Sequence, residues 1–361
     1  MATSGRRGAA VAVALSLALI VVAAIAIRDR SGPDQRQGTA AEHGHGDGNR
    51  SGAGQLIAGA PALAVPDAAV RTVATGLDTV TAIAFRPDGT ALVGERRTGR
   101  IVAVRPDGQA SVFATLSGVL GLTVYADGTV YALQTSTEDN RVVRVHGNGT
   151  VEPVLTGIPR GAARNGGAVV AGPDGMLYVA TGDAGDETAA ADPKSLAGKV
   201  LRLTPGGTPA PGNPVPDSMV YSRGHRDPQG LAWYGQTDLF LAEAGSTPDG
   251  APDRHDELNL IQANGDYGWP AATGFTRDRK YVTPVAAWQP GEAGFGGLAV
   301  QGGRVYLAGT KLYRIWLEGT EPQTLLDGKF GRLRAIATAP DNAVWVATAD
   351  TLIRIAPEAL N

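Results

Sequence analysis

Residues 81–94 read TAIAFRPDGTALVG, an apolar run, a short polar turn and a second apolar run. Asp-Gly between alternating apolar residues is a strong β-hairpin signal, because both residues adopt the backbone angles of a tight turn. The pattern recurs as GLTVYADGTVYAL (121–133), GAVVAGPDGMLYVAT (167–181), GLAWYGQTDLFLAE (230–243), GGLAVQGGRVYLAG (296–309) and RAIATAPDNAVWVAT (334–348). A second hairpin follows most copies, as in GRIVAVRPDGQASVFAT (99–115). Two hairpins make a four-stranded propeller blade, so residues 65–361 are predicted to form one all-β, six-bladed β-propeller.

The ends of this repeat region indicate how the ring closes. The last unit stops at TLIRIAPEALN (351–361), one strand short of a full blade. An isolated apolar run, VRTVATGL (70–77), precedes the first unit. We expect this N-terminal strand to complete the last blade, since closure removes exposed sheet edges that would pair with other chains.

The composition excludes several classes of function. The 361 residues are 43% hydrophobic and include 50 Gly and 23 Pro, which is typical of a turn-rich β protein. The formal net charge of -3 argues against a nucleic-acid partner, because such binding needs a basic surface. The absence of cysteine excludes disulfides, Cys-ligated zinc and thiol catalysis.

The N-terminus is predicted to direct export. Arg6 and Arg7 precede an uncharged apolar run at 9–27, AAVAVALSLALIVVAAIAI. Its 19 residues approach the about 20 that a spanning helix needs, although Ala24-Ile25-Ala26 also suits a signal-peptide cleavage site. We therefore expect residues 1–27 to be a signal anchor or signal peptide, and the protein to be membrane-anchored on the extracytoplasmic face or secreted. Residues 28–64 lack apolar periodicity and are predicted to be a flexible linker.

Several long motifs carry a family resemblance that spans nearly all of residues 70–357. They are YSRGHRDPQGLAW (221–233), DELNLIQANGDYGWP (256–270), GERRTGRIVAV (94–104), GPDGMLYVATGDAGD (172–186), SLAGKVLRLTPGG (195–207) and GRLRAIATAPD (331–341). With these motifs the chain resembles the soluble quinoprotein glucose/sorbosone dehydrogenases. The resemblance implies a six-bladed propeller that oxidises a small sugar with pyrroloquinoline quinone (PQQ) and calcium, and then passes electrons to an external acceptor.

The loop at 222–233 carries the first part of the implied cofactor site. The arginine and glutamine of the family's GHRNPQG loop match Arg226 and Gln229, whereas its asparagine is replaced by Asp227. PQQ is a planar quinone with three carboxylates, and guanidinium groups bind carboxylates through paired hydrogen bonds. The resemblance thus assigns these three residues to cofactor binding.

Three further cations are implied to hold the quinone. The family's late Arg-x-Arg element matches Arg332 and Arg334, and a lysine of the preceding blade matches Lys311. Converging cations repel one another unless an anion lies between them. The alternative is that Arg332 and Arg334 lie on one strand face and pair with local acidic residues.

The resemblance also implies two calcium sites. Gly245 and Ser246 match adjacent backbone carbonyls that hold the cofactor's calcium in the family. Asp256, Glu257 and Tyr267 match positions of a second, structural calcium. Calcium takes six to eight hard oxygen ligands, which the acidic stretch GSTPDGAPDRHDE (245–257) can supply. An ordinary acidic surface loop is the alternative.

One departure from the family concerns the catalytic base. The family's base is a histidine of a His-x-x-Gly-Arg motif, and its position here is Arg164, with Ala168 at the motif's arginine. An arginine cannot accept the proton that a sugar hydroxyl loses on oxidation. Asp183, which matches an acidic residue near the family's active site, or Asp227 can take over as base. Alternatively, the chain is a non-enzymatic exported propeller that binds a glycan or a protein.

Overall fold

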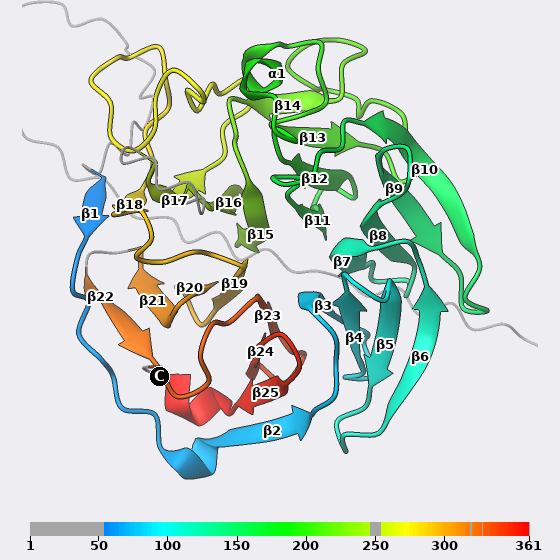
Figure 1. Ribbon diagram of the computed structural model, residues 1–361, viewed down its shortest axis with the longest axis vertical. Coiled ribbons are helices and arrows are strands. Elements are labelled where there is room, and N and C mark those ends of the chain that lie inside the picture. Colours follow the sequence, from blue (N-terminus) through cyan, green and yellow to red (C-terminus); the bar gives the residue numbers. More distant parts are fainter. Residues whose placement is uncertain (1–53, 246–253, 318–319, 327, 361) are drawn as a thin grey trace, which may run out of the picture. The chain divides into compact units, whose positions relative to one another are not determined.

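The computed structural model describes residues 54–245, 254–317, 320–326 and 328–360. In this part of the chain the strands form six sheets, each with four antiparallel strands, arranged as blades around a common centre (Figure 1). One short helix, α1 (Glu187–Ala191), interrupts the third blade between its second and third strands. The predicted all-β, six-bladed propeller is therefore confirmed.

Within each blade the strands are named below in their order from the centre of the ring outward. Blades one and two comprise β3 (Val80–Phe85), β4 (Ala91–Glu95), β5 (Arg100–Val104), β6 (Ala110–Thr115), β7 (Val119–Val124), β8 (Val130–Thr135), β9 (Asn140–Val145) and β10 (Val151–Ile158). Blades three and four comprise β11 (Ala168–Ala171), β12 (Leu177–Thr181), β13 (Lys199–Leu203), β14 (Val220–Arg223), β15 (Pro228–Tyr234), β16 (Asp238–Glu243), β17 (Asp256–Leu260) and β18 (Ala286–Trp288). Blades five and six comprise β19 (Gly297–Gln301), β20 (Arg304–Ala308), β21 (Leu312–Trp316), β22 (Thr320–Leu325), β23 (Ala335–Thr338), β24 (Val344–Ala347), β25 (Leu352–Ile355) and β2 (Val70–Ala74).

The hairpin turns follow from their Asp-Gly sequences. In the first blade the Asp88 carboxylate accepts a hydrogen bond from the Thr90 backbone N–H at 2.9 Å. Between them, Gly89 has a φ of 83°, which a side chain would disfavour. Asp127 and Thr129 make the same contact in the second blade at 2.9 Å. Each turn thereby fixes the register of the two strands it joins.

The ring closes through the N-terminal strand. β2 is the outermost strand of the sixth blade and pairs antiparallel with β25, with Val70 opposite Ile355 (Figure 1). The 3-10 turns Asp67–Ala69 and Pro357–Leu360 flank this junction. The predicted closing role of the strand within residues 70–77 is confirmed.

The prediction of a flexible linker at residues 28–64 is wrong for the last residues of that segment. β1 (Gln55–Ile57) pairs in parallel with β18 and forms the fifth and outermost strand of the fourth blade. Farther along, the Leu63 backbone N–H donates to the Thr324 carbonyl at 2.7 Å on the outer strand of the fifth blade. These hydrogen bonds, together with the burial of Ile57, order a segment whose sequence has no strand periodicity. Residues 1–53, including the apolar run, lie outside the described residues.

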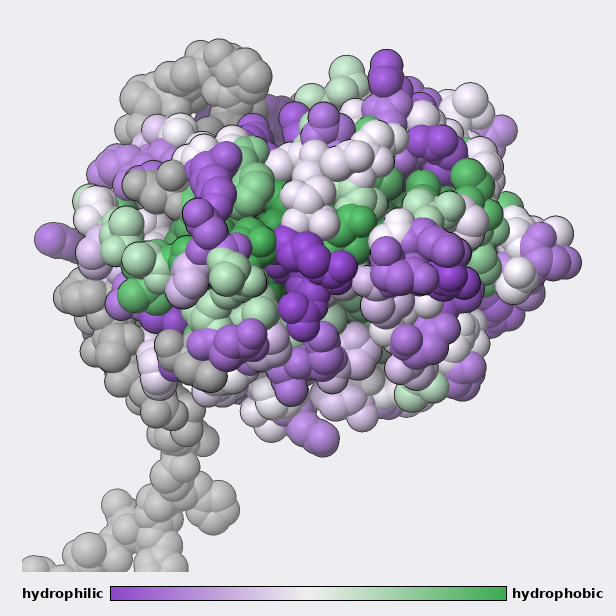
Figure 2. Space-filling view, turned by 90° about the horizontal axis from the view of Figure 1, so that it is seen from below, coloured by the Kyte–Doolittle hydropathy of each residue, from purple (hydrophilic) through white to green (hydrophobic). Residues whose placement is uncertain are grey.

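The hydrophobic core lies between neighbouring blades. Val93 of the first blade packs in one cluster with Trp345 of the sixth, and Phe240 of the fourth with Val305 of the fifth. Each blade thus buries both faces of its sheet, which explains the long apolar runs in the inner strands. On the face shown in Figure 2, hydrophilic residues predominate and hydrophobic ones appear in separate patches. Among the described residues, no helix has the length and apolar character to cross a membrane.

Candidate functional site

The topology places most candidate residues at one end of the central channel. The first and second strands of a blade are antiparallel, so the loop entering the first strand lies beside the loop leaving the second, as with Pro228 opposite Glu243. We call this end, marked by Gly167, Gln229 and Gly296 in the channel wall, the site mouth. The loops that meet there carry Arg164, Asp183, Arg226, Asp227, Gly245, Lys311, Arg332 and Arg334.

Arg164 and Asp183 form a buried ion pair at the site mouth. Arg164 Nε donates to Asp183 Oδ1 at 2.9 Å, and Asp183 is fully buried. The Gly185 N–H also donates to Oδ1, at 2.8 Å, and the Trp269 indole N–H donates to Oδ2 at 2.9 Å. Three donors therefore occupy both oxygens of Asp183. The charged, paired Arg164 cannot act as a base, which agrees with the expectation from its chemistry.

Arg226 is buried beneath the mouth and is held by several contacts. Its backbone N–H donates to Glu243 Oε1, and its Nη1 donates to the Gly245 carbonyl. The guanidinium carbon lies 5.0 Å from the Trp269 ring centroid, within reach of a cation–π contact. Burial lowers the pKa of Arg226, and the nearby Arg164 and Arg254 charges lower it further. A bound anion would relieve this unfavourable environment.

Asp227 follows the buried Arg226 in the loop that enters β15. Its Oδ1 accepts a hydrogen bond from the Gly166 N–H at 3.2 Å, and the residue as a whole is partly exposed. Burial among protein groups raises the pKa of Asp227 to about 7. Gln229, two residues on, lines the channel and donates to the Asp227 backbone carbonyl at 3.4 Å.

Arg332 and Arg334 approach the site mouth from the sixth blade. Within the described part of the chain, neither guanidinium forms a hydrogen bond or an ion pair, so the predicted alternative of local acidic partners is wrong there. Burial lowers the pKa of Arg332, and the Arg334 charge adds to this effect. Lys311 lies in the neighbouring turn between β20 and β21 and is partly exposed. The guanidiniums of Arg332 and Arg334, which have no hydrogen-bonded or ion-paired partner among the described residues, fit a ligand that carries carboxylates.

A family model for glucose/sorbosone dehydrogenases matches residues 77–355 of this chain. The chain belongs to the glucose/sorbosone dehydrogenase family. Among solved structures it is similar to a PQQ-bound aldose sugar dehydrogenase from Streptomyces coelicolor, with 39% identity, a TM-score of 0.74, and 79% of this chain and 97% of that one covered. A Thermus thermophilus protein described as a putative oxidoreductase (glucose dehydrogenase) has 40% identity and a TM-score of 0.73, with 79% and 98% covered.

A third relative is the quinoprotein glucose dehydrogenase B of Acinetobacter calcoaceticus. It is 29% identical over 265 residues, which are 59% of this chain and 54% of that protein. The chain thus spans about half the length of this curated relative. The two solved structures, in contrast, are covered almost completely, so the whole propeller is common to this chain and those members of the glucose/sorbosone dehydrogenase family.

The predicted calcium ligands of this family member differ in how fully they are engaged. Asp256 accepts hydrogen bonds from the backbone N–H groups of Gly245 at 2.9 Å and Gly294 at 2.8 Å, and so ties two loops of the mouth together. The Tyr267 hydroxyl donates to the Leu260 carbonyl. The Gly245 carbonyl accepts from Arg226, and Ser246 lies outside the described residues. Metal roles for these four residues stay predictions.

Glu257 is already engaged by protein donors: its Oε1 accepts hydrogen bonds from the Gly274 N–H and the Thr273 hydroxyl, and its Oε2 accepts one from Asn259 at 3.0 Å. Glu257 and Glu243 line a small cavity of about 10 Å³ beside Tyr267. Burial and the Glu243 carboxylate raise the pKa of Glu257, and a cation between the two would offset both effects. Among the described residues, no group of three or more His, Asp or Glu side chains is arranged to hold a metal, so backbone carbonyls would have to complete a calcium site.

The sequence interpretation missed Glu243, Trp269 and Arg254. Glu243 accepts from Arg226 and contacts His225 Nδ1 at 3.2 Å, thereby fixing the loop at 222–229. Arg226 and Arg254 both lie about 5 Å from the Trp269 ring, at 5.0 and 5.1 Å. The sequence did contain a signal for Glu243, because it is a lone charged residue at the end of the apolar strand β16. A propeller places that end of the strand at the mouth.

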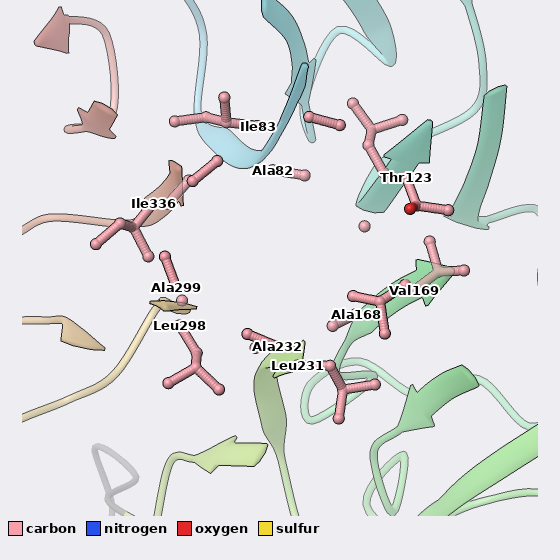
Figure 3. Close-up of a pocket in the computed structure, with 18 of the residues that line it drawn as sticks. Ala82, Ile83, Thr123, Ala168, Val169, Leu231, Ala232, Leu298, Ala299 and Ile336 are labelled. Carbon is pink, nitrogen blue, oxygen red and sulfur yellow. The ribbon is translucent and has the colours of Figure 1, made fainter. Parts of the chain in front are cut away.

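The channel itself is apolar and continues away from these charges. It forms a cavity of about 520 Å³ lined by all six inner strands. Figure 3 shows Ala168, Leu231, Ala299 and Ile336 surrounding this open space. Charged side chains are not part of its lining, so polar recognition in this glucose/sorbosone dehydrogenase family member is concentrated at the site mouth.

Proposed function

We propose that this chain is a PQQ- and calcium-dependent dehydrogenase that oxidises aldose sugars at the site mouth. The observation that carries the proposal is that the guanidiniums of Arg332 and Arg334 form no hydrogen bond or ion pair within the described residues, although their loop reaches the mouth of a sugar-dehydrogenase propeller. These guanidiniums and the buried Arg226 would hold the cofactor's carboxylates, with Lys311 beside them. The solved relative from Streptomyces coelicolor is described as PQQ-bound, which supports this choice of cofactor.

The bound quinone would supply the oxidant, accepting a hydride from the alcohol carbon of the sugar. The chain's residues hold and orient the reactants. The cation–π contact with Trp269 and the hydrogen bond to the Gly245 carbonyl hold Arg226, and the Asp183 network holds Arg164 at the edge of the mouth. Calcium is proposed at Gly245 and Ser246, and at Glu257, where it would neutralise buried carboxylates. The family assignment and the unpaired guanidiniums favour this reading over a non-enzymatic binding propeller.

The decisive experiment is a spectroscopic titration of the full-length protein with PQQ. Binding should require calcium and be lost with a chelator, and an aldose should then reduce the bound cofactor. Arg332→Ala with Arg334→Ala should weaken binding at least about tenfold, since a charge-assisted hydrogen bond contributes about 1.5–3 kcal/mol. Lys329→Ala is the matched control, because it removes a nearby charge whose ion pair, among the described residues, is with the exposed Asp67. Absence of PQQ binding in the wild type would contradict the proposal.

We also propose that the protein is exported and passes electrons to an external acceptor. Support comes from Arg6 and Arg7 ahead of the apolar run at 9–27. N-terminal sequencing of protein from fractionated cells tests this. A start at Ile27 or just after it indicates cleavage, an intact start in the membrane fraction indicates an anchor, and an intact start in the cytosol contradicts export.

A further inference from the structure

A sugar dehydrogenase needs a group that accepts the hydroxyl proton of its substrate. In this chain the position expected for that group holds Arg164, which is charged and paired with Asp183. A base needs a carboxylate oxygen with an open lone pair that can reach substrate. The remaining carboxylates near the mouth are therefore compared by whether each oxygen already accepts a hydrogen bond from the protein.

Asp183 fails this requirement. Both of its oxygens accept hydrogen bonds from protein donors, and the residue has no exposed surface. A substrate hydroxyl would have to displace Arg164, Gly185 or Trp269 to reach it. Glu243 is likewise engaged, by the Arg226 backbone N–H on Oε1 and by His225 near Oε2. Both residues position the loops of the mouth instead.

Asp227 meets the requirement. Its Oδ1 accepts one hydrogen bond, from the Gly166 N–H at 3.2 Å, while Oδ2 has no donor among the described residues. The residue is partly exposed and lies two positions before Gln229 in the channel wall. The charged groups that act on its carboxylate are Arg226, Asp183, Glu243 and, from the sixth blade, Arg332.

We propose that Asp227 is the general base of this enzyme, with Oδ2 accepting the hydroxyl proton of the sugar. This inference rests on the proposed function, which supplies the oxidant. The alcohol carbon loses its hydrogen with both electrons to the quinone, while the hydroxyl proton passes to Asp227. The C–O bond becomes the C=O bond of a lactone, and the protonated Asp227 releases its proton to water before the next turnover.

The acid–base properties of the residue agree with this role. Burial raises the pKa of Asp227 to about 7, and the neighbouring Asp183 and Glu243 charges act in the same direction. The Gly166 N–H and Arg226 oppose the shift without cancelling it. A base that titrates near the working pH combines availability with proton affinity, which an ordinary aspartate does not.

The test compares full-length wild type with Asp227→Asn and Asp227→Glu. PQQ titration of all three proteins measures any contribution of Asp227 to cofactor binding, so that the rates are compared at saturating PQQ. Single-turnover reduction of bound PQQ by an aldose should be about 10²–10⁴-fold slower in Asp227→Asn, the typical effect of losing a positioned base. The wild-type rate should fall below about pH 7, and that acid limb should vanish in Asp227→Asn and persist in Asp227→Glu. Added formate should partly restore Asp227→Asn.

A readout without cofactor accompanies these rates. Carbon NMR of aspartate carboxyl groups in the apo protein should show one resonance titrating near pH 7 that Asp227→Asn removes. Asp186→Asn is the control, because Asp186 is exposed and its carboxylate caps the N-terminus of α1. If Asp227→Asn binds PQQ and keeps the wild-type rate and pH profile, Asp227 is not the base. If it loses PQQ affinity in proportion to rate, Asp227 is a binding residue. If the wild type itself binds no PQQ, the proposed function and the base assignment both fall.

Discussion

Arg164 Nε donates to Asp183 Oδ1 at 2.9 Å, joining the loop that precedes β11 to the loop that follows β12. Where relatives are expected to carry a histidine, this chain therefore has a structural tie. The Arg164 side chain is 15% exposed and that of Asp183 is 0% exposed, so the pair is shielded from water. A cation in this position fixes the mouth and leaves proton transfer to another residue.

Arg164→Ala should lower the free energy of unfolding by about 3 kcal/mol. The reason is that loss of one partner leaves a buried carboxylate without its counter-charge. Urea unfolding at pH 7 measures the effect. Arg97→Ala is the control, because Arg97 pairs with Asp78 but its side chain is 79% exposed, and its loss should lower stability far less than the loss of Arg164. Equal effects of the two variants would contradict the structural tie.

The stability of the apo protein should depend on pH through Asp227. Its pKa is raised from 3.8 to about 7 on folding, so between these values the folded protein holds a proton that the unfolded chain has released. The contribution of Asp227 to the free energy of unfolding therefore falls as pH rises from about 4 to 7. Unfolding curves across this range should show Asp227→Asn gaining stability relative to wild type and then levelling off.

The control variant for that experiment is Asp186→Asn, and its stability relative to wild type should change with pH in the opposite direction. Hydrogen bonds from the Thr188 side chain and the Ala189 backbone lower the pKa of Asp186. Asp186→Asn should accordingly lose, and not gain, stability relative to wild type as pH rises through the acidic range. A flat difference between Asp227→Asn and wild type from pH 4 to 8 would show that Asp227 titrates normally.

Arg332→Ala should have opposite effects on apo and cofactor-bound protein. Without cofactor the variant should be as stable as wild type or more so, because Arg332 is desolvated beside Arg334 and its guanidinium forms no hydrogen bond or ion pair within the described residues. With PQQ at 100 times its Kd, wild type should gain about 2.7 kcal/mol and the variant less. Thermal melts with and without PQQ measure both effects, and a destabilised apo variant would argue for a structural role.

Ile57→Ala should destabilise the propeller by about 2–4 kcal/mol. Ile57 is 3% exposed and packs in the core between the fourth and fifth blades. Its neighbour Leu56 is 46% exposed, so Leu56→Ala should change stability by less than about 0.5 kcal/mol. Denaturant unfolding of the two variants gives the comparison. Similar values for both would mean that β1 does not hold the fourth blade in solution.

Local sequence was sufficient to predict most of the fold. Asp88-Gly89 and its repeats determine hairpins because the turn residues act on their immediate neighbours. The closing strand was predictable because the last blade lacked one strand. β1 was not, because Gln55–Ile57 is a three-residue parallel pairing whose partner, β18, is far along the chain. Pairing of that kind leaves no periodic pattern in either segment.

The site was predictable by position but not by contact. The repeats indicated that the loops holding Arg226 and Asp183 share one mouth, and the structure brings them together through the Asp183 backbone N–H and the Arg226 carbonyl, at 2.8 Å. The partners of each side chain depend on packing between blades three and four. No sequence pattern distinguished the engaged oxygens of Asp183 from the open oxygen of Asp227.

The pairing of β2 with β25 also constrains the order in which the molecule can fold. Val70–Ala74 is made before any blade, yet its partner Leu352–Ile355 belongs to the last few residues of the chain. Until synthesis is complete, both edges remain unpaired and can join strands of neighbouring chains. Contacts this distant in sequence slow folding, because a long loop must close before they form. This protein is therefore most vulnerable to aggregation while its chain is newly made, above all in a crowded environment or one poor in chaperones.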